Sequence, residues 1–224
     1  DFCLSRGLGD VYKRQDVYVR IIDYKTGKKD FNIVKTYYGI DIQLMVYMEA
    51  AMKLVAKMRP GKNVIPAGVF YYNISDPIVS ATTESAEEIE DKIKGELRLK
   101  GMVNSDKDIA EKMDNTEGTS LNIPVSRKAD GGFDSRRSKV MNTEQFNILG
   151  RFVDVRAIDT ADRIVGGDIR RSPYKDGQFS SCDRCPYGAV CGFSVDLPGC
   201  NYRKLKKFDD EVSVSYTHLT LPTT

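Results

Sequence analysis

The chain has 224 residues, of which 41% are hydrophobic and 29% are charged, and its formal net charge at pH 7 is +2. This composition is ordinary for a globular protein, and the charge balance neither requires nor excludes a nucleic-acid partner. Because the sequence has no long apolar run and no secretory signal pattern, we expect a cytoplasmic protein with no transmembrane helix and no membrane partner.

The two ends of the chain differ abruptly in composition from the segments beside them. Residues 1–15 and 212–224 resemble translated sequencing-adaptor sequence, and we interpret them as an artefactual head and tail. The alternative is that both are real but disordered ends. The one histidine, His218, lies in the tail. The body is therefore expected to lack Ser–His and Cys–His catalysis and histidine-containing zinc sites.

The body opens with a pattern that predicts a strand, a long helix and a second strand. Residues 17–24 (VYVRIIDY) and 66–74 (PAGVFYYNI) are short and rich in β-branched and aromatic residues. Between them, residues 39–59 have apolar positions that step by three and four, and Pro60 follows as a helix stop. The predicted apolar stripe of this helix is Ile40, Leu44, Tyr47, Ala51, Leu54 and Met58. A βαβ-type element of an α/β fold is expected.

The middle of the chain predicts two helices. Ser85 and Glu88 have the spacing of a capping box, which predicts a surface helix over 86–100 that ends at Gly101. A second, short helix is expected near 106–113.

The remainder predicts a hairpin, a long helix and a loop-rich end. A β-hairpin is expected over 121–137, because Asp130-Gly131-Gly132 is a typical turn sequence. Asn142 with Gln145 predicts the start of a helix that ends at Gly166-Gly167. Its inward positions are expected to be Phe146, Leu149 and Val153.

A candidate catalytic pair lies at the end of the first predicted strand. Asp23 and Lys25 are two residues apart, so their side chains project from the same face of the strand. A carboxylate can bind Mg²⁺, which stabilises a charged transition state and activates water, and a nearby ammonium can orient that water. Such a pair suits phosphodiester hydrolysis. An Asp-x-Lys at a strand end is also common as a plain surface ion pair.

A second pair lies on the long helix. Gln43 and Tyr47 are four residues apart and share one face. The order IIDYKTG, then QLMVY, resembles the D-Y-K and Q-x-x-x-Y motifs of RecB-type nucleases in the PD-(D/E)xK superfamily. The resemblance implies that Asp23 and the backbone carbonyl of Tyr24 bind the metal. It further implies that Lys25 is catalytic and that Gln43 and Tyr47 contact DNA.

All four cysteines of the body lie near its end. The run SSCDRCPYGAVCGF spaces Cys182, Cys185 and Cys191 closely, and disulfides are rare in cytosolic proteins. The spacing therefore predicts thiolate ligation of zinc or of an iron–sulfur cluster. A four-thiolate site needs one more ligand, either Cys200 or a cysteine upstream of this sequence.

The segment GDIRRSPYKDGQFSSCDRCPYGAVCGF, with the motifs above, resembles the C-terminal end of the B subunit of bacterial AddAB-type helicase–nucleases. The resemblance implies a 4Fe–4S cluster on Cys182, Cys185 and Cys191, with a distant fourth cysteine. It also implies an Mg²⁺-dependent DNA exonuclease of an ATP-dependent complex with a helicase/nuclease A subunit, acting in double-strand break repair by homologous recombination. The implied fold is an incomplete restriction-endonuclease-like α/β core, a mixed sheet flanked by helices, over 16–180. A loop-rich cysteine segment over 181–211 follows.

Two features of that family are absent, an acid in a G-x-x-D-R-x-D type motif and the distant cysteine. Both would precede Asp16, so we expect a truncated chain that is inactive alone. The alternatives are a non-catalytic DNA-binding module with a structural metal or cluster, and a stand-alone RecB-like exonuclease. Two basic groups are candidates for phosphate contacts. We favour the first, Arg20, Lys25, Lys28 and Lys29, and leave open the second, Arg127, Lys128, Arg136, Arg137 and Lys139.

Overall fold

A computed structural model describes residues 16–74, 76–79 and 85–205. The expected artefactual segments, 1–15 and 212–224, lie outside these residues. The centre of the fold is a four-stranded sheet in the order β1-β2-β3-β4. The strands are β1 (Val17–Lys25), β2 (Val64–Asn73), β3 (Lys100–Asn104) and β4 (Val140–Met141). Strand β2 is parallel to β1 and antiparallel to β3, and β4 is parallel to β3. The expectation of a mixed sheet in an α/β fold is therefore confirmed.

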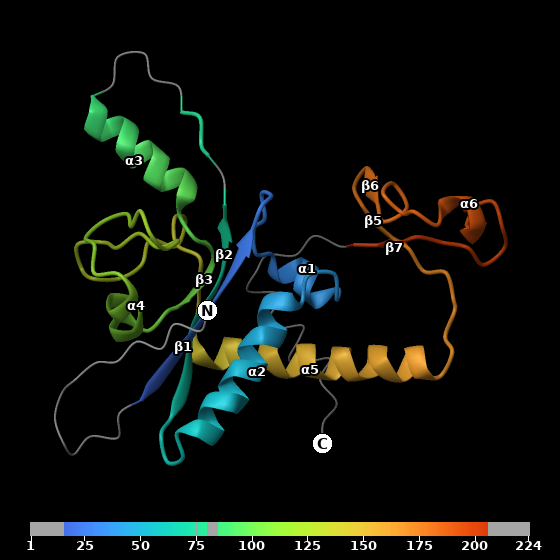
Figure 1. Cartoon of the computed structure of the whole chain (residues 1–224), viewed down its shortest axis with the longest axis horizontal. Helices are drawn as coiled ribbons and strands as arrows, with labels where there is room; N and C mark the ends of the chain where they lie inside the picture. Colours follow the sequence, from blue (N-terminus) through green and yellow to red (C-terminus); the bar gives the residue numbers. More distant parts are fainter. Residues whose placement is uncertain (1–15, 75, 80–84, 206–224) are drawn as a thin grey trace.

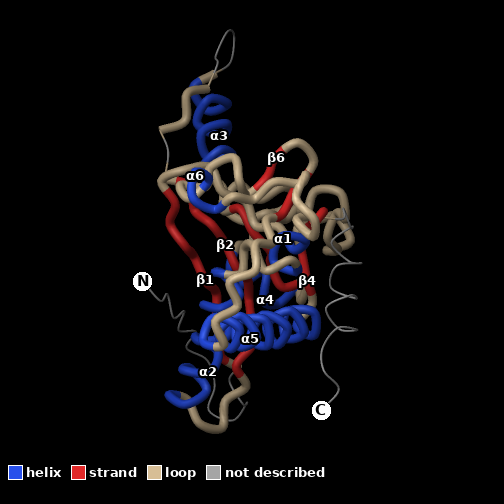
Figure 2. The backbone as a smooth tube through the Cα atoms, turned by 90° about the vertical axis from the view of Figure 1, so that its right-hand side faces the viewer, coloured by secondary structure: helices blue, strands red, loops and turns tan. Residues whose placement is uncertain are grey.

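Helices cover both faces of this sheet (Figure 1). One face carries α1 (Ile33–Tyr37), α2 (Gln43–Met58) and α5 (Thr143–Val165), and Figure 2 shows α5 lying across the strands. The other face carries α4 (Lys107–Met113) and the loop that follows it. Helix α3 (Ala86–Leu97) projects away from the sheet and has no buried residue.

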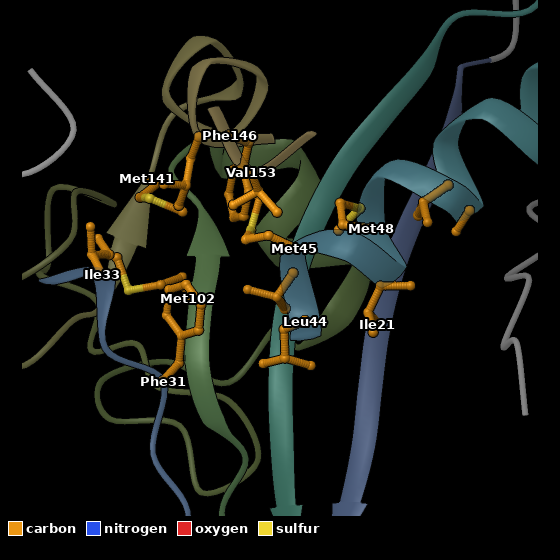
Figure 3. Close-up of a cluster of buried hydrophobic side chains, with 14 of the residues drawn as sticks. Ile21, Phe31, Ile33, Leu44, Met45, Met48, Met102, Met141, Phe146 and Val153 are labelled. Carbon is orange, nitrogen blue, oxygen red and sulfur yellow. The ribbon is translucent and has the colours of Figure 1, made fainter. Parts of the chain in front are cut away.

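The two sheet faces build two hydrophobic cores because neighbouring strand residues point to opposite sides. Val69 and Tyr71 enter the larger core, whereas Phe70 between them enters the smaller one. The larger core joins β1, β2 and β3 to α2 and α5. Figure 3 shows side chains of this core, including Ile21, Leu44, Met45, Met48, Met102 and Phe146. The sheet thereby holds the start of α2 firmly against the ends of β1 and β2.

The predicted apolar stripe of α2 was confirmed at Leu44 and Ala51 and wrong at Tyr47, Leu54 and Met58, because the helix is rotated relative to that stripe. Tyr47, Leu54 and Met58 of that stripe are exposed at 44%, 49% and 59%. The side chains that pack on the sheet are Leu44, Met45, Met48, Ala51 and Val55. Both sets have helical spacing in this methionine-rich sequence, so periodicity alone did not separate them. The observed rotation turns Tyr47 out of the core.

Helix ends agree well with the capping patterns. Ser85 with Glu88 and Asn142 with Gln145 both form complete capping boxes, and α5 ends just before Gly166. The predicted helix over 86–100 was too long, because Gly101 lies inside β3 rather than at a helix end. A Cβ on Gly101 would meet the carbonyl oxygen of Val69 at 1.9 Å, so this glycine permits the close approach of β2 and β3.

The expected hairpin over 121–137 is not a regular pair of strands. The described structure has isolated antiparallel bridges there, Thr119 to Ser126 and Arg127 to Phe133, and the turn at 130–132 closes the second bridge. The loop-rich end contains a small three-stranded sheet that the sequence did not reveal. It is formed by β5 (Tyr174–Asp176), β6 (Phe179–Ser180) and β7 (Arg203–Lys204), with α6 (Gly188–Cys191) beside it.

Candidate active site

Asp23 and Lys25 lie together at the end of β1 and face the start of α2. The Lys25 Nζ is 2.8 Å from Asp23 Oδ2, and the same Nζ donates a hydrogen bond of 2.9 Å to Gln43 Oε1. The side chains of Lys25 and Asp23 are 29% and 17% exposed, so the ion pair is half-buried and open on one side. The Lys25 ammonium is thus contacted by Asp23 from strand β1 and by Gln43 from helix α2.

Gln43 and Tyr47 extend this set along the helix. Gln43 is the first residue of α2, and its Nε2 donates a hydrogen bond of 2.9 Å to the Tyr47 hydroxyl one turn later. The four side chains therefore form one chain of contacts, from Asp23 through Lys25 and Gln43 to Tyr47. Tyr47, the last member of this series of contacts, is exposed and therefore accessible to a large substrate.

The Asp23 carboxylate is the acidic group of this set and the one that could bind a cation. Its Oδ2 is buried and accepts no hydrogen bond within the described structure, although it lies in ion-pair contact with Lys25. The ammonium is the partner that the structure gives this oxygen, and such a carboxylate oxygen suits a divalent cation, because Mg²⁺ binds carboxylate oxygens. Asp23 is not sufficient alone, since no group of three or more His, Cys, Asp or Glu in the described part of the chain could hold a metal.

Tyr24 has its side chain on the opposite face, where it packs edge-on against Tyr72 with ring centroids 5.6 Å apart. Its side chain thus takes no part in the contacts of Asp23 and Lys25. A role of its backbone carbonyl as a metal ligand stays a prediction.

Two residues that sequence reasoning missed, Tyr71 and Asp41, lie directly behind this site together with Lys29 of the first basic group. Tyr71 of β2 donates a hydrogen bond of 2.8 Å to Asp41 Oδ1, and Lys29 Nζ lies 3.1 Å from Asp41 Oδ2. Burial raises the pKa of Tyr71, and its hydrogen bond to Asp41 raises that pKa further, so the phenol stays protonated. The strand pairing that brings Tyr71 opposite Asp23 was not readable from the sequence. The sequence contained one weak indication of Asp41, because it is an acidic residue near the start of the predicted helix.

Several residues of both basic groups have partners within the described structure. In the first group, Lys25 and Lys29 are ion-paired to Asp23 and Asp41. In the second, Arg127 donates hydrogen bonds to the backbone carbonyls of Asp114 and Thr116, which gives this residue a structural task. Lys139 pairs with Asp30 at 2.8 Å, and Arg137 lies 3.9 Å from Asp134.

The four cysteines of the body are all free thiols. Cys185 is exposed, Cys182 and Cys191 are half-buried, and Cys200 is buried. The backbone N–H of Cys185 donates to the Cys182 carbonyl, so these two lie in one turn. The described residues do not gather three cysteines into a metal-holding group. The expected iron–sulfur cluster is therefore not supported by this arrangement of side chains.

The fold and the site define a nuclease of the PD-(D/E)XK type. The chain matches the PD-(D/E)XK nuclease superfamily over residues 10–192, and it belongs to that family. This confirms the resemblance given by the D-Y-K and Q-x-x-x-Y motifs.

The relatives of the chain include the B subunits of three ATP-dependent helicase/deoxyribonucleases. The one from Thermoanaerobacter sp. (strain X514) is 36% identical over 205 residues, which cover 90% of this chain and 18% of the relative. The one from Caldanaerobacter subterraneus subsp. tengcongensis is 38% identical over 202 residues, 89% of this chain and 17% of the relative. The one from Clostridium botulinum (strain Hall) is 39% identical over 198 residues, 87% of this chain and 17% of the relative. The chain thus spans less than a fifth of the length of these relatives.

Among the described helices, none has the length and apolar character needed to cross a bilayer.

Proposed function

We propose that this chain is the nuclease part of a deoxyribonuclease that hydrolyses DNA phosphodiester bonds. The observation that carries the proposal is the chain of contacts from Asp23 through Lys25 and Gln43 to Tyr47. These residues have the chemistry of a phosphodiesterase site: a carboxylate, an oriented ammonium paired with it, and two polar groups at the start of a helix.

Each residue has a distinct task in this proposal. Asp23, with the Tyr24 carbonyl and an acid from outside the described residues, would hold Mg²⁺. Bound there, the cation would stabilise the charge that develops on the phosphate and lower the pKa of a water. Lys25 is held by Asp23 and Gln43, so its ammonium is fixed where it can orient the attacking water or neutralise the phosphate. Gln43 and Tyr47 present polar groups to the DNA backbone.

The names of the relatives support a wider setting for this activity. We propose that the chain forms part of a longer B subunit, which works with an A subunit in a helicase/nuclease complex on DNA in the cytoplasm. Double-strand break repair by homologous recombination is the proposed role. Two alternatives are a non-catalytic DNA-binding module and a stand-alone RecB-like exonuclease. An upstream acid on a strand of the native gene product would favour catalysis, and upstream helicase sequence would exclude the stand-alone enzyme.

The test uses the full-length product of the native gene, expressed with its partner. Asp23→Ala and Lys25→Ala should each reduce Mg²⁺-dependent DNA cleavage by at least about a hundredfold, because each removes a group that acts on the developing charge. Chelation of the metal should stop cleavage by the unchanged protein. The matched controls are Glu90→Ala and Lys94→Ala, which remove an exposed ion pair of 2.8 Å on α3 and should leave cleavage unchanged. Full cleavage by Asp23→Ala would refute the assignment.

For the cysteines we propose ligation of a 4Fe–4S cluster by Cys182, Cys185 and Cys191, with a fourth cysteine from outside this chain or, in its absence, Cys200. The close spacing of three free thiols in one short segment supports this proposal. The purified complex should carry iron and acid-labile sulfide and show visible cluster absorption. Cys185→Ser should abolish both, whereas Cys200→Ser should leave them intact in the full-length protein. Stoichiometric zinc in a colourless protein would contradict the cluster.

A further inference from the structure

Tyr71 lies beneath the candidate active site and contacts two of its cations. It is fully buried, and it pairs with Asp23 across the β1–β2 ladder, so both side chains point to the same face. The ammonium groups of Lys25 and Lys29 each lie 5.6 Å from the centre of its ring. The ring face is electron-rich and attracts such cations. Tyr71 is therefore the third neighbour of the Lys25 ammonium, after Asp23 and Gln43.

The hydroxyl of Tyr71 connects the sheet to the beginning of α2. It donates to Asp41 Oδ1 at 2.8 Å, and Asp41 lies two residues before Gln43, where α2 starts. The Thr36 hydroxyl holds the same segment by donating to the Asp41 backbone carbonyl at 2.8 Å. Asp41 is only 6% exposed. Because Asp41 lies so close to Gln43 in the chain, the contacts that hold Asp41 in place also hold the first turn of α2 and the backbone of Gln43.

The charge of Asp41 is balanced locally. Its second oxygen lies 3.1 Å from Lys29 Nζ. Asn73, the last residue of β2, holds the backbone of Lys29 by accepting from its N–H at 3.0 Å and donating to its carbonyl at 3.1 Å. The loop after β1, the end of β2 and the start of α2 are thus tied together by one buried carboxylate.

We propose that Tyr71 and Asp41 are positioning residues of the nuclease site. Their hydrogen bond sets the distance between β2 and the first turn of α2, and this distance places Gln43 Oε1 on the Lys25 ammonium. The proposal rests on the proposed nuclease function. Tyr71 and Asp41 act on the reaction through Gln43 and Lys25. Loss of the bond lets Gln43 shift away from Lys25, which slows the chemical step more than it weakens DNA binding.

The experiment uses the full-length protein with its partner. Tyr71→Phe keeps the ring beside both lysines and removes the hydroxyl that holds Asp41. We expect kcat for DNA cleavage to fall about tenfold, because small errors in the placement of a reacting group are costly, with KM for DNA within about twofold. The control is Ser120→Ala. It also removes a buried hydroxyl from a carboxylate, Asp114, at 2.7 Å, but on the opposite face of the sheet. It should leave kcat unchanged.

A double-mutant cycle separates positioning from a general loss of stability. If Tyr71 acts through Gln43, Tyr71→Phe has no further effect on kcat in a Gln43→Ala background. If the two losses multiply, the positioning role is refuted. An unchanged kcat in Tyr71→Phe alone also refutes it.

A second pair of variants serves if Tyr71→Phe does not fold. Asp41→Asn keeps an oxygen that can accept from Tyr71 but loses the ion pair with Lys29, so its kcat should fall clearly less than that of Asp41→Ala, which should fall about tenfold as in Tyr71→Phe. Equal losses in both Asp41 variants would contradict the proposal.

Asp23→Ala in the same assay distinguishes failure of the nuclease assignment from failure of the positioning role. If cleavage survives Asp23→Ala, the nuclease assignment itself is wrong. If cleavage stops there but Tyr71→Phe is normal, only the positioning role is wrong.

Discussion

Asp114 offers a quantitative test of how the second face of the sheet is held. It follows α4, and its side chain is nearly buried. Its Oδ1 accepts from the backbone N–H of Thr116 at 2.7 Å, and its Oδ2 accepts from Ser120 Oγ at 2.7 Å and Asn122 Nδ2 at 2.8 Å. Burial by itself would raise the pKa of Asp114, but these hydrogen bonds together lower it to about 2.

The depressed pKa makes the stability of the fold depend on pH. The ordinary value for this carboxyl is 3.8. Because the folded value is the lower one, the carboxylate stabilises the folded state above about pH 4, and this contribution is lost as the pH falls from about 4 to about 2. The difference between a pKa of 3.8 and one of about 2 corresponds to about 2 kcal/mol of folding free energy. The charge of Asp114 thus contributes a substantial part of the marginal stability of a domain.

The measurement is urea unfolding of wild type and Asp114→Asn from pH 7 down to about pH 2. The asparagine cannot titrate, so the stability gap between the two proteins should shrink by about 2 kcal/mol over this range. Asn122→Ala removes one of the donors to Asp114, so its own stability should fall less steeply than that of wild type between pH 4 and pH 2, but more steeply than that of Asp114→Asn. If Asp114→Asn and wild type lose stability in parallel between pH 4 and pH 2, the hydrogen bonds do not hold the carboxylate as described.

Three further predictions concern the sheet and the site. Gly101→Ala should lower the free energy of unfolding by several kcal/mol, since its Cβ would meet the Val69 carbonyl at 1.9 Å, and urea unfolding measures this loss. Asn104→Ala should cost about 2 kcal/mol in the same assay, because Asn104 is buried and donates to the Pro66 carbonyl at 2.7 Å. Gln43→Ala should lower kcat for DNA cleavage about tenfold with little change in melting temperature, as the amide is a partner of the Lys25 ammonium at a half-exposed site. An unfolding midpoint equal to wild type for Gly101→Ala, or an undiminished kcat for Gln43→Ala, would contradict the geometry on which each rests.

Local signals in the sequence were sufficient for most of the elements around the site. The capping pairs at Ser85 and Asn142 marked the starts of α3 and α5, and β-branched and aromatic runs marked β1 and β2. The Asp-x-Lys spacing also gave the shared face of Asp23 and Lys25, because alternation along a strand is a local property. Strand β3 was not found, since its five residues follow a helical pattern directly and include a glycine.

What the sequence did not give depends on contacts between distant elements. The rotation of α2 about its axis is decided by the sheet on which it packs, and two stripes of apolar residues fitted the helical period equally well. The place of Tyr71 beside Asp23 depends on the register of β1 against β2, which connects residues 48 positions apart. A shift of this register by one residue would turn Tyr71 to the other face relative to Asp23, and the pattern within either strand does not show which residues become partners.

The topology explains why these distant residues meet at one place. Strands β1 and β2 are parallel, so the chain must cross back between them, and α2 makes that crossing. The carboxyl end of β1 and the start of α2 therefore lie at the same edge of the sheet, and so does the carboxyl end of β2. Asp23 and Lys25 lie at the end of β1, Gln43 lies at the start of α2, and Tyr71 lies near the end of β2. The first turn of α2 lacks a side-chain cap at Ile42. The hydrogen bond from Tyr71 to Asp41 therefore adds a polar contact between β2 and the segment that starts this turn, beside the packing of Leu44 and Met45 on the sheet. Its loss should disturb the position of Gln43 more than it disturbs the hydrophobic core.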